Sequence, residues 1–194
     1  MRNVHFLSDK TIIPLHDISE DTAAFFMKAT TDNLLQFILS KKVILVEGAA
    51  EYILMEHFVS IVTQKSPEEL GIWLISLNNL SFARYLELAQ KLKIKVAAIR
   101  DNDGKDIERY KTFWNDHIKV FSDSDVSRHT FEICLYQDNQ ALCDAIFSDG
   151  NNPQEQMLGE KAEAAYKLLC SPEIDTIKVP EYIRKAIEWL AANP

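Results

Sequence analysis

The sequence is poor in cysteine, and the few cysteines are not spaced as pairs. Cys134, Cys143 and Cys170 are the only three in 194 residues, and no CxxC spacing occurs. An odd number without that spacing argues against a disulfide framework and against a zinc site. Such cysteine usage is typical of a reducing compartment, so we expect a cytoplasmic location.

Long apolar segments and a targeting sequence are also missing. No apolar run approaches the roughly 18 residues that a membrane span needs. The first residues, Met1 to Ser8, have neither the basic nor the apolar region of a signal peptide. Hydrophobic residues nevertheless make up 47% of the chain, which is enough for a core. We therefore expect a soluble protein that does not contact a membrane.

The chain has no excess of basic residues. It contains 21 lysines and arginines against 29 acidic residues, for a net charge of −8. Nucleic-acid binders usually carry a basic surface, because affinity comes from neutralising phosphates and releasing counterions. Two interpretations remain open: nucleic acid is not the partner, or the acidity is concentrated where cations bind and the phosphates meet metal.

Short apolar runs alternate with helical patterns in the middle of the chain. Four runs have the composition of buried strands, at residues 42–47, 72–77, 95–100 and 118–121. Helical spacing fills the intervals, at residues 51–64, 82–92 and about 106–115. This alternation predicts βαβ units and an α/β fold with a parallel sheet covered on both faces.

The two ends of the chain have different patterns. Residues 1–18 predict a lead-in strand or linker, and helical spacing with a break at residues 30–32 follows. Beyond residue 130 the pattern is helical throughout, at residues 132–136, 139–147, 155–169 and 180–192. The loop at residues 148–154 is the clearest domain edge. We predict three parts: a lead-in segment with helices (1–40), an α/β core (41–130) and a helical appendage (131–194).

Acidic residues follow the predicted strands. Glu47 closes the first run and Glu51 lies one helical turn later, Asp101 and Asp103 follow the third run, and Glu132 comes after the fourth. Ligands of open α/β sheets bind beyond the carboxyl ends of the strands, so these carboxylates are expected at one rim. Two carboxylates about 5 Å apart repel by roughly 3 kcal/mol at an effective dielectric near 20. Divalent cations that prefer hard oxygen ligands, such as Mg²⁺, Mn²⁺ or Ca²⁺, would relieve this repulsion.

Each acidic motif also has an ordinary explanation. A glutamate at a strand end is usually a solvated surface residue, and Asp-x-Asp-Gly is a common turn. The occurrence of both at the ends of apolar strands in one βαβ array is what favours a metal site. Gly48 and Gly104, directly after the acids, allow tight turns and close approach of a phosphate.

Two segments carry a resemblance to a known family. Ile44-Leu-Val-Glu-Gly-Ala-Ala-Glu51, followed by Ala98-Ile-Arg-Asp-Asn-Asp-Gly104, resembles the Toprim signature of topoisomerases, primases and related nucleases. More narrowly, residues 32–48 and the Tyr-Lys-Leu-Leu segment after Lys161 are similar to the C-terminal half of OLD-family (overcoming lysogenization defect) endonucleases. The resemblance covers about residues 22–190. It implies a Toprim-like Rossmannoid parallel sheet flanked by helices, with a C-terminal helical appendage.

The resemblance further implies a DNA endonuclease that uses two Mg²⁺ or Mn²⁺ ions. The family's metal ligands correspond to Glu47, Glu51, Asp101, Asp103 and Glu132, with Glu47 also a candidate for the base that orients water. For the last ligand, Asp123 and Asp125 are alternatives to Glu132.

The resemblance also concerns a lysine and the partners. The family's lysine best matches Lys161, which would neutralise charge developing on the phosphate; Lys167 stays an alternative, because the usual lysine-glycine pair is absent. Full members carry an N-terminal ABC-type ATPase, and no Walker A pattern occurs here, so the ATPase is expected to be absent from this chain. DNA is the expected partner, and the ATPase region or a homodimer would supply basic surface. Phage defence is implied at the level of the family only.

Two other functions stay open. A haloacid-dehalogenase-type phosphotransferase also has Asp-x-Asp after a strand, but it leaves the Val-Glu-Gly strand unexplained. A non-catalytic metal-binding module would serve assembly or sensing.

Several further side chains are expected to have structural roles. His57 is expected to pack or cap, His129 to lie in a surface loop, and Cys134 to be a small core residue. The three tryptophans are expected in the core or between helices, at Trp73, Trp114 and Trp189. Ser76 and Asn78 are expected at the rim of the sheet.

Overall fold

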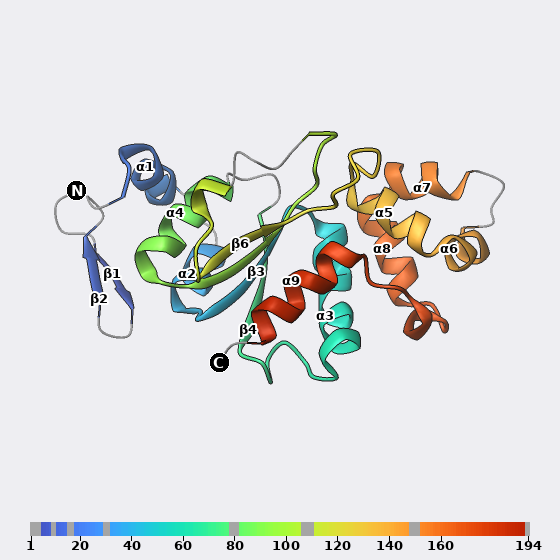
Figure 1. Cartoon of the computed structure of the whole chain (residues 1–194), viewed down its shortest axis with the longest axis horizontal. Helices are drawn as coiled ribbons and strands as arrows, with labels where there is room; N and C mark the ends of the chain where they lie inside the picture. The colour runs from blue at the N-terminus through green and yellow to red at the C-terminus, as the bar shows by residue number, and fades with distance from the viewer. Residues whose placement is uncertain are drawn as a thin grey trace.

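The computed structural model describes residues 5–8, 11–14, 18–28, 32–77, 82–105, 111–147 and 152–192. Its centre is a four-stranded parallel sheet in the order β4-β3-β5-β6, with helices on both faces (Figure 1). The strands are β3 (Lys42–Val46), β4 (Ile72–Ser76), β5 (Lys95–Ile99) and β6 (Ile118–Phe121). The predicted α/β fold with a parallel sheet is confirmed, and all four strands lie where the apolar runs placed them.

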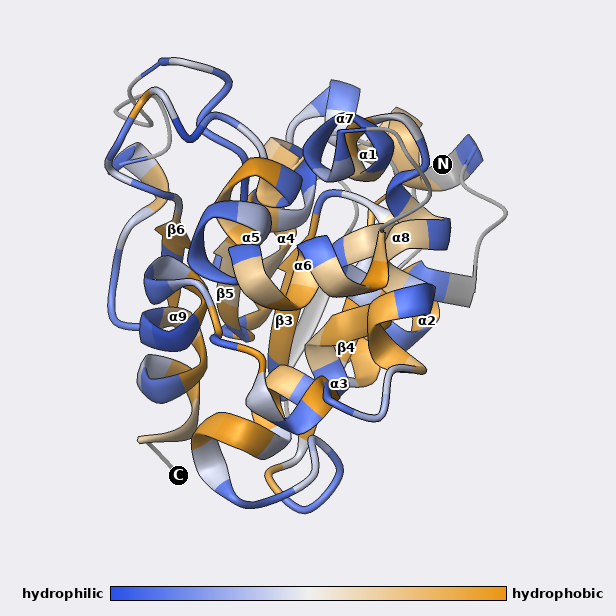
Figure 2. Ribbon diagram, turned by 90° about the vertical axis from the view of Figure 1, so that its right-hand side faces the viewer, coloured by the Kyte–Doolittle hydropathy of each residue, from blue (hydrophilic) through white to orange (hydrophobic). Residues whose placement is uncertain are grey.

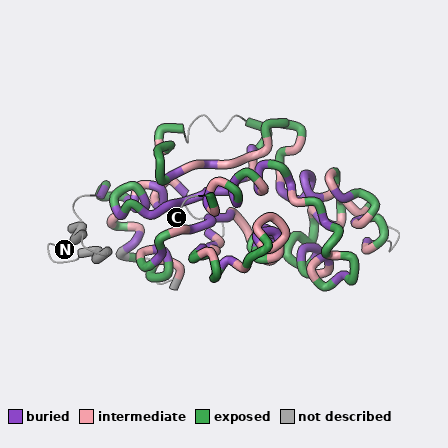
Figure 3. Tube along the Cα trace, turned by 60° about the horizontal axis from the view of Figure 1, so that its bottom comes forward, coloured by how far each residue is buried: buried purple, intermediate pink, exposed green. Residues whose placement is uncertain are grey.

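The inner strands are apolar on both sides because both sides are covered. β5 is buried along its whole length, and β3 is buried after its first residue. Alternate side chains point to opposite faces of the sheet, so Ile44 and Ala97 enter one core while Val43 and Val96 enter the other. The central strands are accordingly hydrophobic in Figure 2 and buried in Figure 3.

Two groups of helices cover the sheet. On one face lie α3 (Ala49–Thr63) and α9 (Glu181–Ala191), and α9 packs against β5 and β6. On the other face lies α4 (Phe82–Leu92), joined by α1 (Glu20–Lys28) and α2 (Asp32–Leu39). The ring of Tyr85 makes edge contacts with Phe26 and Phe37 in this second core, at centroid distances of 5.2 and 5.1 Å.

The remaining elements extend the two ends of the molecule. Four helices gather beside α3, to its right in Figure 1: α5 (Phe131–Asp138), α6 (Gln140–Ile146), α7 (Pro153–Gly159) and α8 (Lys161–Leu169). Their apolar residues share one hydrophobic cluster with α3 and α9. A short 3₁₀ helix, η3 (Ile174–Thr176), precedes α9. At the other end, β1 (His5–Ser8) pairs antiparallel with β2 (Thr11–Pro14). The division into three parts at residues 40 and 130 stays a prediction.

Some expectations about the helices were wrong or fall outside the described residues. The single helix predicted for residues 155–169 is two helices, because the chain leaves helical geometry at Glu160 (φ −122°, ψ 46°) directly after Gly159. Of the helix predicted for residues 106–115, residues 106–110 lie outside the described chain and residues 111–113 form a 3₁₀ turn. Of the loop predicted for residues 148–154, residues 148–151 lie outside it, and Asn152 caps α7 by accepting from the Gln154 N–H. None of the helices among the described residues has the length and apolar character to cross a bilayer.

The tryptophans were only partly predicted. Trp189 packs against Phe121 with 6.0 Å between ring centroids. Trp73 and Trp114 were expected in the core or between helices, but they are 48% and 41% exposed. Trp73 is exposed because β4 pairs with β3 alone among the described strands, which makes it an edge strand there.

The sheet topology creates a switch point at the carboxyl ends of β3 and β5. The chain passes from β3 through α3 to β4 on one side, and then through α4 to β5 on the other side of β3. Because α3 and α4 cover opposite faces, the two crossovers leave in opposite directions. Ligands bind at such a switch point in open α/β sheets.

Candidate metal centre

Four acidic residues come from three parts of the chain to the carboxyl ends of β3 and β5. Glu47 directly follows β3, and Glu51 lies in the first turn of α3. Asp101 is the second residue after β5, and Glu132 is the second residue of α5. The parallel register pairs Leu45 with Ala98, which brings the ends of the two strands level with each other. We name these residues the acidic cluster: Glu47, Glu51, Asp101 and Glu132.

The carboxylate of Glu51 is held in an unfavourable environment for a charge. Glu51 is only 5% exposed. Burial raises the pKa of Glu51 to about 7, and the negative charges of Glu132 and Glu47 add to this effect. The backbone N–H of Glu51 and the charge of Lys161 act in the opposite direction without cancelling it.

Asp101 is in a similar state. Burial raises the pKa of Asp101 to about 8, with further contributions from the charges of Glu51, Glu132 and Glu47. One carboxylate oxygen, Oδ1, accepts a hydrogen bond of 2.8 Å from the N–H of Phe131, the first residue of α5. Asp101 therefore ties the end of β5 to the helix that carries Glu132.

Lys161 balances part of this negative charge. Its Nζ donates a hydrogen bond of 2.9 Å to Oε2 of Glu132, whose side chain is 4% exposed. Burial alone would lower the pKa of Lys161, but the bond to Glu132 and the charges of Glu132 and Asp101 outweigh it and raise the pKa. Lys161 is half-exposed, so it lies at the boundary between the acidic cluster and solvent.

A second cation pairs with the cluster, and the sequence analysis missed it. Arg100 donates from Nε and Nη2 to the two oxygens of Glu47, at 3.2 and 3.1 Å. Its guanidinium also lies over the ring of Phe82, 4.8 Å from the centroid. The signal available in the sequence was an arginine at the end of an otherwise apolar strand, directly before Asp101.

The structure does not bring Asp103 to the buried cluster. Asp103 is exposed and has a left-handed backbone (φ 53°), as does Gly104 (φ 69°). In this turn the N–H of Asp103 donates a hydrogen bond of 3.3 Å to the carbonyl of His129. Of the five carboxylates expected at the rim, four lie in the acidic cluster and the fifth, Asp103, lies on an exposed turn.

The other acids considered in place of Glu132 are engaged elsewhere. Asp123 forms an ion pair of 2.8 Å with Arg128, and Asp125 accepts bonds from the N–H and hydroxyl of Ser127. Glu132, in contrast, is buried and contributes to the raised pKa values of Glu51 and Asp101.

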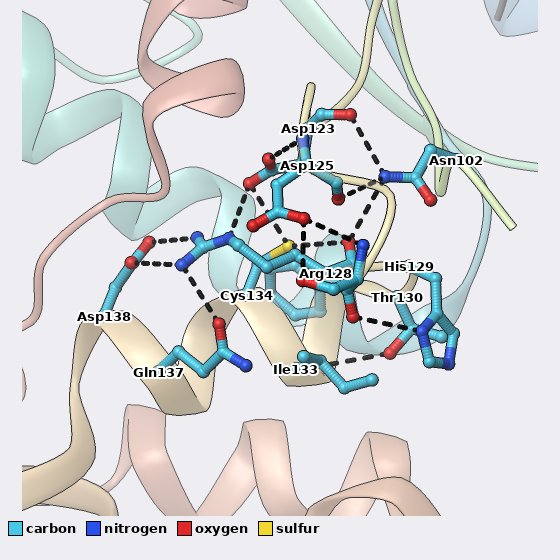
Figure 4. A network of polar contacts seen from close by, with 12 residues as sticks. Asn102, Asp123, Asp125, Arg128, His129, Thr130, Ile133, Cys134, Gln137 and Asp138 are labelled. Atoms are coloured by element: carbon cyan, nitrogen blue, oxygen red, sulfur yellow. Dashed lines mark hydrogen bonds and ion pairs between the residues drawn. The ribbon is translucent and has the colours of Figure 1, made fainter. Parts of the chain in front are cut away.

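Asn102, the middle residue of the Asp-x-Asp motif, fastens the loop before α5 (Figure 4). It is 6% exposed, and its Nδ2 donates to the carbonyls of Asp123 and Asp125 at 3.1 and 3.0 Å. A longer bond of 3.4 Å reaches the carbonyl of Arg128, and the Asn102 Oδ1 accepts from the Gly104 N–H at 2.8 Å. Arg128 adds an ion pair of 2.8 Å to Asp138 in α5. The loop that leads to Glu132 is thus held by a residue that the sequence analysis did not single out.

We expect Asn102→Ala to loosen this loop. The change removes the donor to these carbonyls, and the loss of buried hydrogen bonds should lower the free energy of unfolding by about 2 kcal/mol. Amide hydrogen exchange of residues 123–130 should become faster, and urea unfolding should report the loss of stability. Asp125→Asn in the same loop, which keeps an oxygen for the Ser127 N–H, is the control. Unchanged exchange in the Asn102 variant would contradict this role.

The remaining residues considered from the sequence have other surroundings. The His57 ring lies against η3, with Nε2 3.3 Å from the carbonyl of Ile174, and His129 is exposed. Cys134 is buried, and burial raises its pKa to about 12, which is unsuitable for a nucleophile. The carbonyl of Ser76 accepts a bond of 3.0 Å from Asn33, and Asn78 lies outside the described residues.

The donor chemistry of the acidic cluster fits a hard divalent cation. Carboxylate oxygens are the ligands that Mg²⁺ and Mn²⁺ prefer. Among the described residues, however, no three acidic, histidine or cysteine side chains are arranged as an assembled metal site. The pairs Arg100–Glu47 and Lys161–Glu132 account for part of this, because each engages oxygens that a metal ion would use.

The raised pKa values predict how the stability of the metal-free protein depends on pH. Glu51 and Asp101 have ordinary values of 4.5 and 3.8, against about 7 and about 8 in the fold. The folded state therefore keeps protons that the unfolded chain has released. This contribution to stability is full below about pH 4 and is lost as the pH rises through about 7 to 8.

Urea unfolding in the presence of a chelator tests this dependence. We expect a lower free energy of unfolding at about pH 8.5 than at about pH 5.5. Asp101→Asn should flatten the dependence because it removes one of the two titrating groups. A wild-type stability that rises over this interval would contradict the prediction.

Comparison with known proteins places this site in a class. Residues 38–103 match the family described as overcoming lysogenization defect protein-like, TOPRIM domain. The C-terminal region of the Burkholderia pseudomallei OLD protein is similar in structure, with a TM-score of 0.59 and 19% sequence identity over 78% of this chain and 97% of that chain. The C-terminal region of the Xanthomonas campestris pv. campestris OLD protein has a TM-score of 0.53 and 19% identity, over 79% of this chain and 95% of that chain. No curated protein matches the chain.

Over the matched residues 38–103, the parallel sheet with acids at the carboxyl ends of β3 and β5 is therefore similar to a Toprim domain. More narrowly, these residues match the Toprim model of overcoming lysogenization defect protein-like sequences. The OLD C-terminal structures are similar in fold over 78% and 79% of this chain.

Proposed function

We propose that this chain is the catalytic Toprim portion of a metal-dependent DNA endonuclease of the OLD type. One observation carries the proposal. Acidic side chains that follow β3 and β5 or lie in α3 and α5 meet at the topological switch point of the sheet, where burial and then the neighbouring negative charges raise the pKa values of Glu51 and Asp101. A protein maintains such repulsion at a cost in stability, and active sites are where it is commonly found.

The chain's own residues have separable roles in this proposal. Glu47, Glu51, Asp101 and Glu132 would hold divalent cations, either Mg²⁺ or Mn²⁺, and the exposed Asp103 is assigned to a second ion at the outer rim. When bound, the ions would supply positive charge to the phosphodiester and make water a better nucleophile. Glu47, fixed by Arg100, is suited to orient that water.

Lys161 is assigned to the phosphate. Its ammonium group is half-exposed and already lies 2.9 Å from Glu132. A preorganised cation in this position stabilises negative charge as it develops on the phosphoryl oxygens. Lys161 would then exchange its partner, from Glu132 in the metal-free protein to the phosphate in the complex.

A plasmid-nicking assay tests the proposal. We expect the purified chain to convert supercoiled DNA to open-circular or linear forms with Mg²⁺ or Mn²⁺, and EDTA to stop the reaction. An ATPase region of the kind that full OLD-family members carry would provide part of the DNA affinity, because the chain itself carries a net charge of −8. Absence of cleavage at high protein concentration with either metal would reject the proposal for this chain.

One observation favours a second candidate, a non-catalytic module for assembly or sensing. Two of the four clustered carboxylates are already neutralised by Arg100 and Lys161, so the fold does not need a metal to pair them. A module of this kind would show no metal-dependent nicking, even where a metal titration shows binding at the cluster. Metal titration and the nicking assay together separate the two candidates.

A further inference from the structure

A pocket lies beside the acidic cluster, at the same edge of the sheet. It has a volume of about 270 Å³ and is lined by residues of α2, the start of α3 and the end of β4: Asn33, Gln36, Ala49, Tyr52, Leu74 and Ser76. The strand order is β4-β3-β5, so β4 lies on the side of β3 away from β5. The pocket at the end of β4 is therefore one strand away from the switch point between β3 and β5.

Tyr52 links the pocket to the acidic cluster. It directly follows Glu51 in α3, and successive residues of a helix point in directions about 100° apart. Glu51 is buried among the acids, whereas Tyr52 is 47% exposed and lines the pocket. A molecule bound at the cluster could therefore place an adjoining group against the ring of Tyr52.

The chemical character of the pocket limits what it can bind. None of the described residues that line the pocket is charged, so this lining does not suit a phosphate or a metal ion. An aromatic ring, two aliphatic side chains and two amides suit a flat ring with hydrogen-bonding groups at its edge. Asn33 is fixed by its bond of 3.0 Å to the carbonyl of Ser76. The volume lies below the roughly 300–1,000 Å³ of pockets for drug-sized ligands, which fits a single base.

We propose that this pocket binds one unpaired nucleobase of the substrate, next to the phosphate held at the acidic cluster, with Tyr52 as its stacking surface. The proposal rests on the proposed nuclease function and narrows the substrate to DNA with an unpaired base. Single strands, gaps and flaps satisfy this requirement directly. A fully paired duplex must first expose a base, which costs a few kcal/mol of lost stacking and pairing.

Binding of DNA that contains the fluorescent base analogue aminopurine tests the proposal. The complete chain is titrated into a short single-stranded DNA and into the matching duplex, with Ca²⁺ and separately with EDTA. Tyr52→Ala should weaken single-strand binding about tenfold, as expected for loss of one base-stacking contact. Tyr52→Phe keeps the ring and should bind within about twofold of the wild type.

Tyr166→Ala, which removes another exposed aromatic ring, on α8, is the matched control and should leave binding unchanged. Equal binding by Tyr52→Ala and the wild type would overturn the proposal, as would equal affinity for the duplex and the single strand. The nicking assay is read separately. If the wild type cleaves DNA but Tyr52→Ala binds DNA as the wild type does, only the proposal for the base pocket is rejected. If binding depends on Tyr52 but the chain never cleaves DNA, only the proposed nuclease function is rejected.

Discussion

Asp101→Asn is expected to reduce metal-dependent DNA cleavage by a factor on the order of a thousand and to leave the fold intact. The substitution keeps the oxygen that accepts the hydrogen bond from the Phe131 N–H. It removes the negative charge that the proposal assigns to metal binding. Initial rates of plasmid nicking over a range of Mg²⁺ and Mn²⁺ concentrations measure the effect, and circular dichroism checks the fold.

The matched control is Asp116→Asn, because Asp116 is exposed and lies before β6, at the opposite end of the strands. This variant should cleave DNA at the wild-type rate. In the metal-free state, Asp101→Asn should be at least as stable as the wild type at neutral pH, since it removes a carboxyl group that the fold must keep protonated. A folded Asp101→Asn protein that still nicks DNA at a similar rate would refute the role of Asp101.

Lys161→Met is expected to lower cleavage by about a hundredfold to a thousandfold. The long apolar side chain preserves much of the packing on α8 while it removes the charge. The substitution also leaves Glu132 buried without its cation, so we expect a loss of stability of about 1–3 kcal/mol in the metal-free protein. Nicking rates and urea unfolding measure the two effects separately.

A double variant distinguishes a role in catalysis from a role in folding. Lys161→Met combined with Glu132→Gln removes the unpaired buried charge and should recover most of the lost stability. Cleavage should stay low, because neither the lysine nor the full acidic cluster is restored. Lys161→Arg, which keeps a positive charge at the same position, should retain more activity than Lys161→Met. Equal activity of Lys161→Met and the wild type would remove Lys161 from the proposed mechanism.

The strands were predictable because their burial on both faces leaves a continuous apolar run in the sequence. β5, for example, is buried at every position and was placed within one residue. The helices after residue 150 were less predictable, because the apolar spacing continues across Gly159 while the backbone does not. The exposure of Trp73 depends on which strands pair, and an edge strand has no signature in the residue itself.

The candidate site was predictable in part for similar reasons. Acids that follow parallel strands are brought together by the topology alone, as with Glu47 and Asp101. Asp103 could not be judged from spacing, since its direction depends on the left-handed turn that it adopts. Arg100 acts through Glu47, 53 positions away, and Asn102 bonds to Asp123, 21 positions away. Only the folded chain shows such contacts.

Anomalous diffraction from a crystal of this chain soaked in Mn²⁺ tests the central claim most directly. We predict an anomalous peak bounded by the carboxylates of Glu51, Asp101 and Glu132, with the Lys161 ammonium group moved away from Glu132. A crystal that shows no peak at these residues, or that holds Mn²⁺ only at acids outside the cluster such as Asp123 and Asp125, would contradict the claim that these side chains form a metal centre.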